Sequence, residues 1–217
     1  MEVGSYYTPT WKVTFNPGNY EYGPETGIKV SRWLIYDDNI SRDDAPEGSF
    51  KPIQITTTTN YSFHVKAFYT DGSIPLTNLK SEKESLAIKA STVEKDTPII
   101  SGYRNSFYGS FNEKEFKLNS DNIRTLTPSN KTLAKGSSFA VPIPIGSQRI
   151  VIAYPASLGE INSICDRNGL GANIKSGFQI SQINVEGANG YDAIPYYVYS
   201  IDRAEPNKTP NYYDVII

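Results

Sequence analysis

The chain has 217 residues, of which 21 are Lys or Arg and 23 are Asp or Glu, so its formal net charge is −2. The basic residues are spread among acidic ones, whereas a DNA- or RNA-binding protein needs grouped cations that displace phosphate counterions. No stretch approaches the roughly 20 apolar residues that span a bilayer, and the single cysteine excludes an internal disulfide. We therefore expect no nucleic-acid partner and no membrane insertion.

The composition predicts an all-β protein. Sixteen Tyr and nine Phe accompany many Thr, Ser, Ile and Val residues, and these types favour pleated, half-buried surfaces. Because the length exceeds that of a usual single domain, we predict two antiparallel β-sandwich domains with at most one or two short helices. Pro98 begins a new pattern after two charged segments, so the predicted domains are residues 1–97 and 98–217.

The predicted strands of the first domain follow one another through short turns. Trp11–Phe15 alternates apolar and polar residues, and Ile28–Tyr36 does so until its period falters at Arg32–Trp33, which indicates a bulge. Tyr61–Tyr69 alternates up to a turn at Thr70–Ser73. This rhythm is typical of an immunoglobulin-like or fibronectin type III-like sandwich.

The second domain contains the clearest predicted helix and the clearest predicted central strand. Ser120–Leu126 suits a single helical turn capped by Ser120 or Asp121. Phe139–Ile145 carries two alternate prolines, which confine it to the edge of a sheet. Arg149–Tyr154 is nearly all apolar, so we expect it at the centre of the core with both faces buried.

Two glycine-rich segments are predicted to be turns. Asp166–Asn173 lacks the following long helix of a Rossmann loop and the Gly-Lys-Ser/Thr of a phosphate-binding loop, so we expect no cofactor there. In Glu186–Tyr191 the positions Gly187, Asn189 and Gly190 are expected to adopt positive φ in a tight connection. The value of both segments is therefore architectural.

The remaining candidate catalytic residues do not form a recognisable catalytic set. His64 is the only histidine, and its place in an alternating strand predicts a solvent-facing residue. Cys165 has no evident base. The acids within Asp37–Glu47 and Asp192–Glu205 suit solvated loops first, a Ca²⁺ site second, and a glycan-cleaving pair least. We predict no enzyme, and no catalytic, cofactor or metal site.

Three motifs in the second domain carry a family resemblance. They are Gly102-Tyr-Arg-Asn-Ser-Phe-Tyr-Gly109, Arg149-Ile-Val-Ile-Ala-Tyr-Pro155 and Val185-Glu-Gly-Ala-Asn-Gly-Tyr191. In this order they resemble the carboxy-terminal β module of bacteriophage virion structural proteins of the tail, baseplate or neck. The resemblance covers roughly residues 60–217, and its motifs are turns and strands rather than a catalytic signature.

The resemblance implies a non-enzymatic structural component of a phage particle. Such a protein is made in the cytoplasm of the bacterial host and is located in the virion. Its expected partners are other virion proteins and further copies of itself, because virion components act by repetition and avidity.

Six residues are candidates for structural or interface roles. Tyr103, Arg104 and Phe107 lie near the predicted domain junction, where the planar guanidinium of Arg104 would bind loop carbonyls or a carboxylate. The other three are Tyr196, Tyr197 and Tyr199. On a strand, Tyr197 and Tyr199 face opposite to Tyr196, so we expect one face to be buried and the other to lie in a subunit interface.

The aromatic residues suit a second function. Several of them would suit platforms on which sugar rings stack, namely Trp11, Tyr20, Tyr22, Trp33, Tyr36 and the carboxy-terminal Tyr196, Tyr197, Tyr199, Tyr212 and Tyr213. The alternative function is therefore a module at the tip of a phage tail or fibre that binds a host receptor or surface glycan. Exposed, coplanar aromatic rings would favour this alternative, whereas aromatic rings in the core or in subunit contacts would not.

Overall fold

The computed structural model describes residues 1–16, 27–37, 42–77, 83–112, 115–131 and 133–217. Strands make up 49% of the chain and helices 7%, so the predicted all-β class is confirmed. The immunoglobulin-like or fibronectin-like character of the first domain stays a prediction. No helix in the described ranges is long and apolar enough to cross a membrane.

The chain forms two compact units that we call the small unit and the large unit. The small unit contains Tyr6–Ile53 and Asn60–Ile100, and the large unit contains Met1–Ser5, Gln54–Thr59 and Ser101–Ile217. The division after Ser5 and around residues 54–59 differs from the predicted cut after Thr97. A single cut cannot describe these units, because backbone pairing ties two early segments to the late part of the chain.

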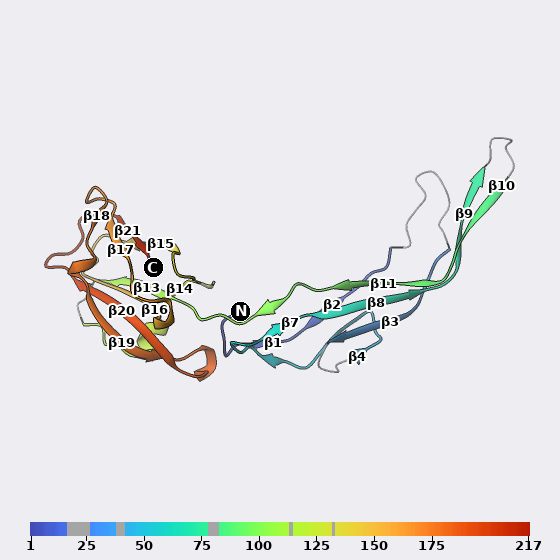
Figure 1. The fold of residues 1–217 in the computed structure, drawn as a ribbon, viewed down its shortest axis with the longest axis horizontal. Coiled ribbons are helices and arrows are strands. Elements are labelled where there is room, and N and C mark those ends of the chain that lie inside the picture. The colour runs from blue at the N-terminus through green and yellow to red at the C-terminus, as the bar shows by residue number, and fades with distance from the viewer. Residues whose placement is uncertain (17–26, 38–41, 78–82, 113–114, 132) are drawn as a thin grey trace. The chain divides into compact units, whose positions relative to one another are not determined.

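The first part of the chain supplies short strands and one larger sheet (Figure 1). The strands are β1 (Tyr6–Tyr7), β2 (Thr10–Lys12), β3 (Val30–Asp37), β4 (Arg42–Asp43), β5 (Glu47–Ser49), β6 (Ile53–Gln54), β7 (Asn60–Tyr61), β8 (Phe63–Tyr69), β9 (Gly72–Thr77), β10 (Lys83–Ile88), β11 (Ser91–Asp96) and β12 (Ile100–Ser101). The larger sheet has the order β11-β8-β3-β4. Its core face packs Ile35 and Phe63 against Trp11 and Phe50, whose rings are 4.6 Å apart.

Two strand pairs of the small unit form one continuous ribbon. Tyr69 of β8 faces Ser91 of β11, and Gly72 of β9 faces Ile88 of β10, so the register is the same in both pairs. The turn predicted at Thr70–Ser73 is therefore wrong, because the chain continues from β8 into β9 without reversing. The bulge in β3 exists, but it lies between Val30 and Arg32 instead of at Arg32–Trp33.

The described residues of the large unit form two antiparallel sheets and one short α-helix, and the strands are labelled in Figure 1. Its elements are β13 (Phe107–Phe111), α1 (Ser120–Arg124), β14 (Thr127–Pro128), β15 (Ser138–Ile143), β16 (Arg149–Pro155), η1 (Ala156–Leu158), β17 (Ser163–Asp166), β18 (Ala172–Asn173), η2 (Lys175–Gly177), β19 (Gln179–Val185), η3 (Ala188–Gly190), β20 (Ile194–Asp202) and β21 (Asn211–Ile216). The sheet orders are β14-β13-β16-β20-β19 and β15-β21-β17-β18. β15 is thus an edge strand, as its prolines predicted.

The central strand β16 is buried on both faces, which confirms the prediction for Arg149–Tyr154. Ile152 and Tyr154 pack in one cluster with residues of β15, β17 and β21. Val151 and Ala153 pack in a second cluster that includes Ile123 of α1. The second sheet therefore covers one face of the five-stranded sheet, and α1 covers the other.

The helix α1 begins one residue earlier than a cap at Ser120 would place it, and its cap is a different residue. Its N-cap is Asn119, whose side-chain oxygen accepts a hydrogen bond from the Asn122 amide at 2.9 Å. Ser120 and Asp121, the predicted caps, belong to the first turn. The Ser120 hydroxyl instead accepts a hydrogen bond from the Glu186 amide at 3.1 Å. The cap therefore moves by one residue, because Ser120 contacts the neighbouring turn.

The tyrosines of β20 do not divide into one buried and one exposed face. Tyr196 is 1% exposed and lies in the cluster beneath α1. Tyr199 is fully buried between the two sheets, where Tyr197 packs as a partly buried neighbour. The prediction that one face lies in a subunit interface is wrong for Tyr196 and Tyr199, because the sequence did not show that both faces of this sheet are covered.

Replacing Tyr199 with Phe tests how much the large unit depends on a buried hydroxyl. The Ile161 amide donates to the Tyr199 oxygen at 3.1 Å, and both residues are fully buried. Tyr199→Phe should lower the free energy of unfolding by about 1–3 kcal/mol, because the amide loses its acceptor away from water. Chemical denaturation measures this loss. Tyr212→Phe, at a residue that is 47% exposed, should change stability little, and equal effects of the two variants would contradict the account.

Candidate functional site

The large unit contains a socket that holds residues 1–5, which we call the amino-terminal segment. Glu2 forms a parallel bridge with Tyr103. The Val3 amide donates to the Tyr103 carbonyl, and the Tyr103 amide donates to the Met1 carbonyl, both at 2.9 Å. The motif at residues 102–109 therefore provides one wall of the socket.

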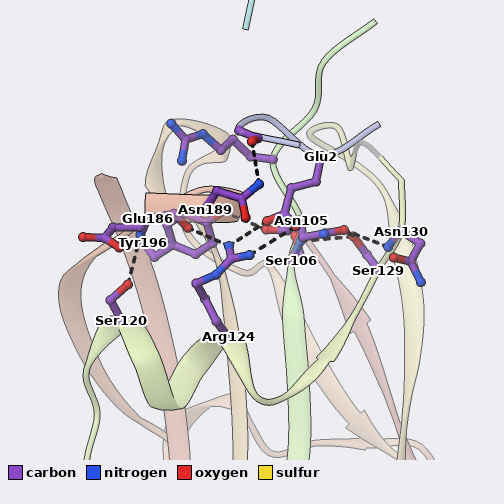
Figure 2. A network of polar contacts seen from close by, with 12 residues as sticks. Glu2, Asn105, Ser106, Ser120, Arg124, Ser129, Asn130, Glu186, Asn189 and Tyr196 are labelled. Atoms are coloured by element: carbon purple, nitrogen blue, oxygen red, sulfur yellow. Dashed lines mark hydrogen bonds and ion pairs between the residues drawn. The ribbon is translucent and has the colours of Figure 1, made fainter. Parts of the chain in front are cut away.

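The turn at residues 186–191 provides the opposite wall. The Ala188 amide donates to the Val3 carbonyl at 2.8 Å, and the Asn189 side-chain amide donates to the Gly4 carbonyl at 3.0 Å (Figure 2). The Val3 side chain is fully buried between these walls. Two of the three sequence motifs, residues 102–109 and 185–191, thus meet on one short segment.

Residues 54–59 complete the socket. The Gly4 amide donates to the Ile55 carbonyl at 2.7 Å, and the Ile55 amide donates to the Ser5 carbonyl at 2.8 Å. A side chain at Gly102 would begin 2.0 Å from the Thr56 carbonyl oxygen, so only glycine permits this approach. The amino-terminal segment is consequently held by backbone groups from three separate parts of the chain.

The positive φ values predicted for the turn are only partly confirmed. Asn189 has φ 52° and Gly190 has φ 72°, as expected. Gly187 has φ −75°, so the prediction is wrong there. Glycine is needed at 187 for a different reason, since a Cβ would lie 2.7 Å from the Val3 carbonyl oxygen.

An ion pair joins the amino-terminal segment to α1 (Figure 2). The two terminal nitrogens of Arg124 contact the two carboxylate oxygens of Glu2 at 2.7 and 3.3 Å. Arg124 also donates to the Glu186 carbonyl at 2.8 Å, and its guanidinium lies 5.8 Å from the centre of the Phe107 ring. Both charged side chains are at least three-quarters buried, so this pair is better shielded from water than a surface pair.

Arg104 binds a loop carbonyl, as predicted. One of its terminal nitrogens donates to the Asp192 carbonyl, and its guanidinium lies 5.3 Å from the centre of the Tyr191 ring. Its Nε and Nη1 atoms are buried without a hydrogen-bond partner. Arg104 therefore fixes the end of the turn at residues 186–191 through one hydrogen bond and one cation–π contact.

A buried polar network supports the floor of the socket (Figure 2). The Tyr196 hydroxyl donates to the Asn105 carbonyl at 2.8 Å, and burial raises the pKa of this phenol. The Asn105 side-chain oxygen accepts from the Asn130 amide at 2.8 Å. Four predicted site residues, Tyr103, Arg104, Phe107 and Tyr196, thus lie in or beneath the socket, whereas Tyr197 and Tyr199 lie on the other face of the sheet.

His64 and Cys165 belong to different units. His64 is less exposed than predicted, with 22% of its side chain accessible, and its Nδ1 lies 2.7 Å from a carboxylate oxygen of Asp96. Its ring also stacks on Tyr36 with the centres 4.8 Å apart. Cys165 is a partly buried free thiol on β17. These contacts place the histidine in a network across the surface of a sheet.

Two of the acidic residues, Asp37 and Asp202, have separate partners. Asp37 is buried and accepts from the Tyr61 hydroxyl at 3.0 Å, while Asp202 pairs with Arg149 at 3.5 Å. Within the described ranges, no three His, Cys, Asp or Glu residues gather as a metal-binding group. Asp38 and residues 39–41 of the predicted acidic loop lie outside those ranges.

Trp11, the first residue of the predicted aromatic platform, is too buried to bind a sugar ring. Trp11 is 7% exposed and lies in the core of the small unit, and its indole nitrogen donates to the Ala45 carbonyl. Trp33 packs against the same core as a partly buried neighbour, and Tyr20 and Tyr22 lie outside the described residues. A sugar ring cannot stack on the indole of Trp11 in this fold.

The sequence did not predict the roles of Glu2, Gly4 or Arg124. The pairing of Glu2 with Arg124 spans 122 residues, and no local pattern records a contact over that distance. The sequence signal for these roles is the triplet Glu2-Val-Gly4. Its acid pairs with Arg124, its valine is buried, and its glycine approaches the Ala188 carbonyl.

Comparison with known proteins adds no assignment. No protein-family model matches the chain. Searches of the curated proteins and of the solved structures also gave no match.

Removing Arg124 tests the ion pair of the socket. Arg124→Ala should lower the free energy of unfolding of the large unit by about 1.5–3 kcal/mol, since Glu2 and the Glu186 carbonyl both lose a charged donor. The matched control is Lys208→Ala, because Lys208 pairs with Glu205 at the surface and such pairs contribute about 0–1 kcal/mol. Urea denaturation of both variants measures the difference. Equal, small losses would show that the Glu2 pair does not stabilise the fold.

Replacing Gly4 tests the close approach of the segment to the turn. Gly4 and Gly136 have φ of +90° and +86°, but only Gly4 has a neighbour close enough to clash, with the Ala188 carbonyl oxygen 1.9 Å from a new Cβ. Gly136→Ala should cost about 1–2 kcal/mol from conformation alone, and Gly4→Ala should cost more because the segment must move. Thermal unfolding and cleavage by an aminopeptidase measure the effect. Indistinguishable variants would contradict the described packing of Gly4.

Proposed function

We propose that the protein is a non-enzymatic structural component of a bacteriophage particle, in its tail, baseplate or neck. The observation that carries this proposal is that the three motifs resembling phage virion proteins all have structural roles in the large unit. Residues 149–155 form the central strand, and residues 102–109 and 186–191 hold the amino-terminal segment. Each motif is engaged in building a stable module, which is what a structural component requires.

The charged side chains of the socket also support an architectural role. Glu2 and Arg124 neutralise each other, and Arg104 is directed at a backbone carbonyl. A reactive site would need such groups to face a substrate, whereas here they connect segments of the chain. The proposed partners are other virion proteins and further copies of this chain, located in the virion.

Particle composition tests this function. We expect the protein in purified particles of the phage that encodes it, in a fixed ratio to the other virion proteins by quantitative mass spectrometry. Immunogold labelling should place it on the tail, baseplate or neck. Detection in infected cells but never in purified particles would refute the proposal. Specific binding to a glycan array by a protein that is confined to fibre tips would instead favour the receptor-binding alternative.

A further inference from the structure

The strand β19 is an open edge of the five-stranded sheet. It pairs with β20 in an unbroken antiparallel register, from Gln179 opposite Ser200 to Val185 opposite Ile194. Within the described residues, no other segment forms a backbone hydrogen bond with β19. The N–H and C=O groups that point away from β20 are therefore available to a further strand.

The sequence of β19 has none of the features that protect an edge strand. Edge strands avoid unwanted pairing by being short, or by containing charged residues or proline. β19 has seven residues, Gln-Ile-Ser-Gln-Ile-Asn-Val, with no charge and no proline. A strand that is long, neutral and open is a template on which another strand can pair.

The other edge strands of the described sheets have such protection. Each of them has three residues or fewer, or contains proline or charged residues. Pro75 lies in β9 and Pro142 in β15, while the sequences of β10 and β11 include Lys and Glu. β19 is the exception among the described edge strands, which indicates that its edge is paired in the assembled protein.

The exposed side chains of β19 favour a second copy of the chain as the partner. Gln179, Gln182 and Asn184 are exposed, and each of their amides both donates and accepts hydrogen bonds. An amide can therefore pair with an identical amide, whereas a charged side chain favours the opposite charge. A second β19 brings no like charges and has the same length, so the strand is complementary to itself.

We propose that β19 of one copy pairs antiparallel with β19 of a second copy, with Gln182 of both copies at the centre. This register pairs all seven residues and places Ile180 opposite Asn184 of the second copy. Ile180 is 46% exposed, and it loses exposed surface in this arrangement. Because both copies use the same surface, the contact has two-fold symmetry and joins two five-stranded sheets into one. This inference rests on the proposed structural function and names the surface through which two copies assemble.

The first test places charges at the centre of the pairing. Gln182→Glu and Gln182→Lys each put two like charges opposite one another, so both variants should self-associate about 2- to 5-fold more weakly than the unmodified chain. An equal mixture of the two variants should recover the association as a heterodimer, because opposite charges then face each other. Light scattering over a range of concentrations measures each variant and the mixture.

The matched controls are Gln54→Glu and Gln54→Lys, which make the same changes at an exposed residue of β6. We expect these controls to associate like the unmodified chain, and all four variants to keep its circular dichroism spectrum. An unmodified chain that stays monomeric at every concentration would overturn the proposal. A mixture of the two Gln182 variants that associates no better than either alone would overturn it as well.

The second test traps the register. In a Cys165→Ser background, an Ile180→Cys chain is mixed with an Asn184→Cys chain under mild oxidation, and we expect a disulfide-linked heterodimer. Either chain alone should cross-link poorly, because its two cysteines would lie about 14 Å apart along the paired strands, beyond the reach of a disulfide. Equal yields from the mixture and from the separate chains would overturn the proposal.

The outcomes for this contact and for the proposed function are distinguishable. A β19-linked dimer of a protein that never enters particles would refute the function and retain the contact. A protein found in particles whose Gln182 variants associate like the Gln54 controls would retain the function and refute the contact.

Discussion

Burial of β16 and β20 on both faces is the constraint on which the large unit depends. Ile152 and Tyr199 contact the second sheet, and Val151 and Tyr196 lie beneath α1. A sheet covered on both faces positions β13 and the turn at residues 186–191, and the amino-terminal segment lies between them. If the second sheet and α1 did not cover this sheet, the distance between residues 102–109 and the turn at residues 186–191 would not be fixed.

The sequence predicted those features that depend on neighbouring residues. The apolar run at 149–154 indicated a central strand, and the prolines of 139–145 indicated an edge. It failed where distant segments decide the outcome. Tyr196 and Tyr199 both proved to be buried because α1 and a second sheet cover opposite faces, and a strand's own alternation does not record what packs on it.

The socket shows the same limit at the level of single residues. The carbonyl partner of Arg104 was predicted from the chemistry of guanidinium, but the partner of Arg124 was not, because Glu2 is 122 residues away. Gly187 was predicted to be needed for a positive φ, but its φ is negative. Glycine is needed there because a Cβ would clash with the Val3 carbonyl oxygen. A glycine can serve either an unusual φ or a close approach, and only the three-dimensional neighbours distinguish the two.

The separation in sequence between the amino-terminal segment and its walls affects how the chain folds. The contact between Asn189 and Gly4 spans 185 residues, so the amino-terminal segment is synthesised long before the turn that binds it. Contacts at such separations raise the contact order and slow folding. The Val3 side chain, which is fully buried in the fold, therefore stays exposed until the turn at residues 186–191 has been synthesised.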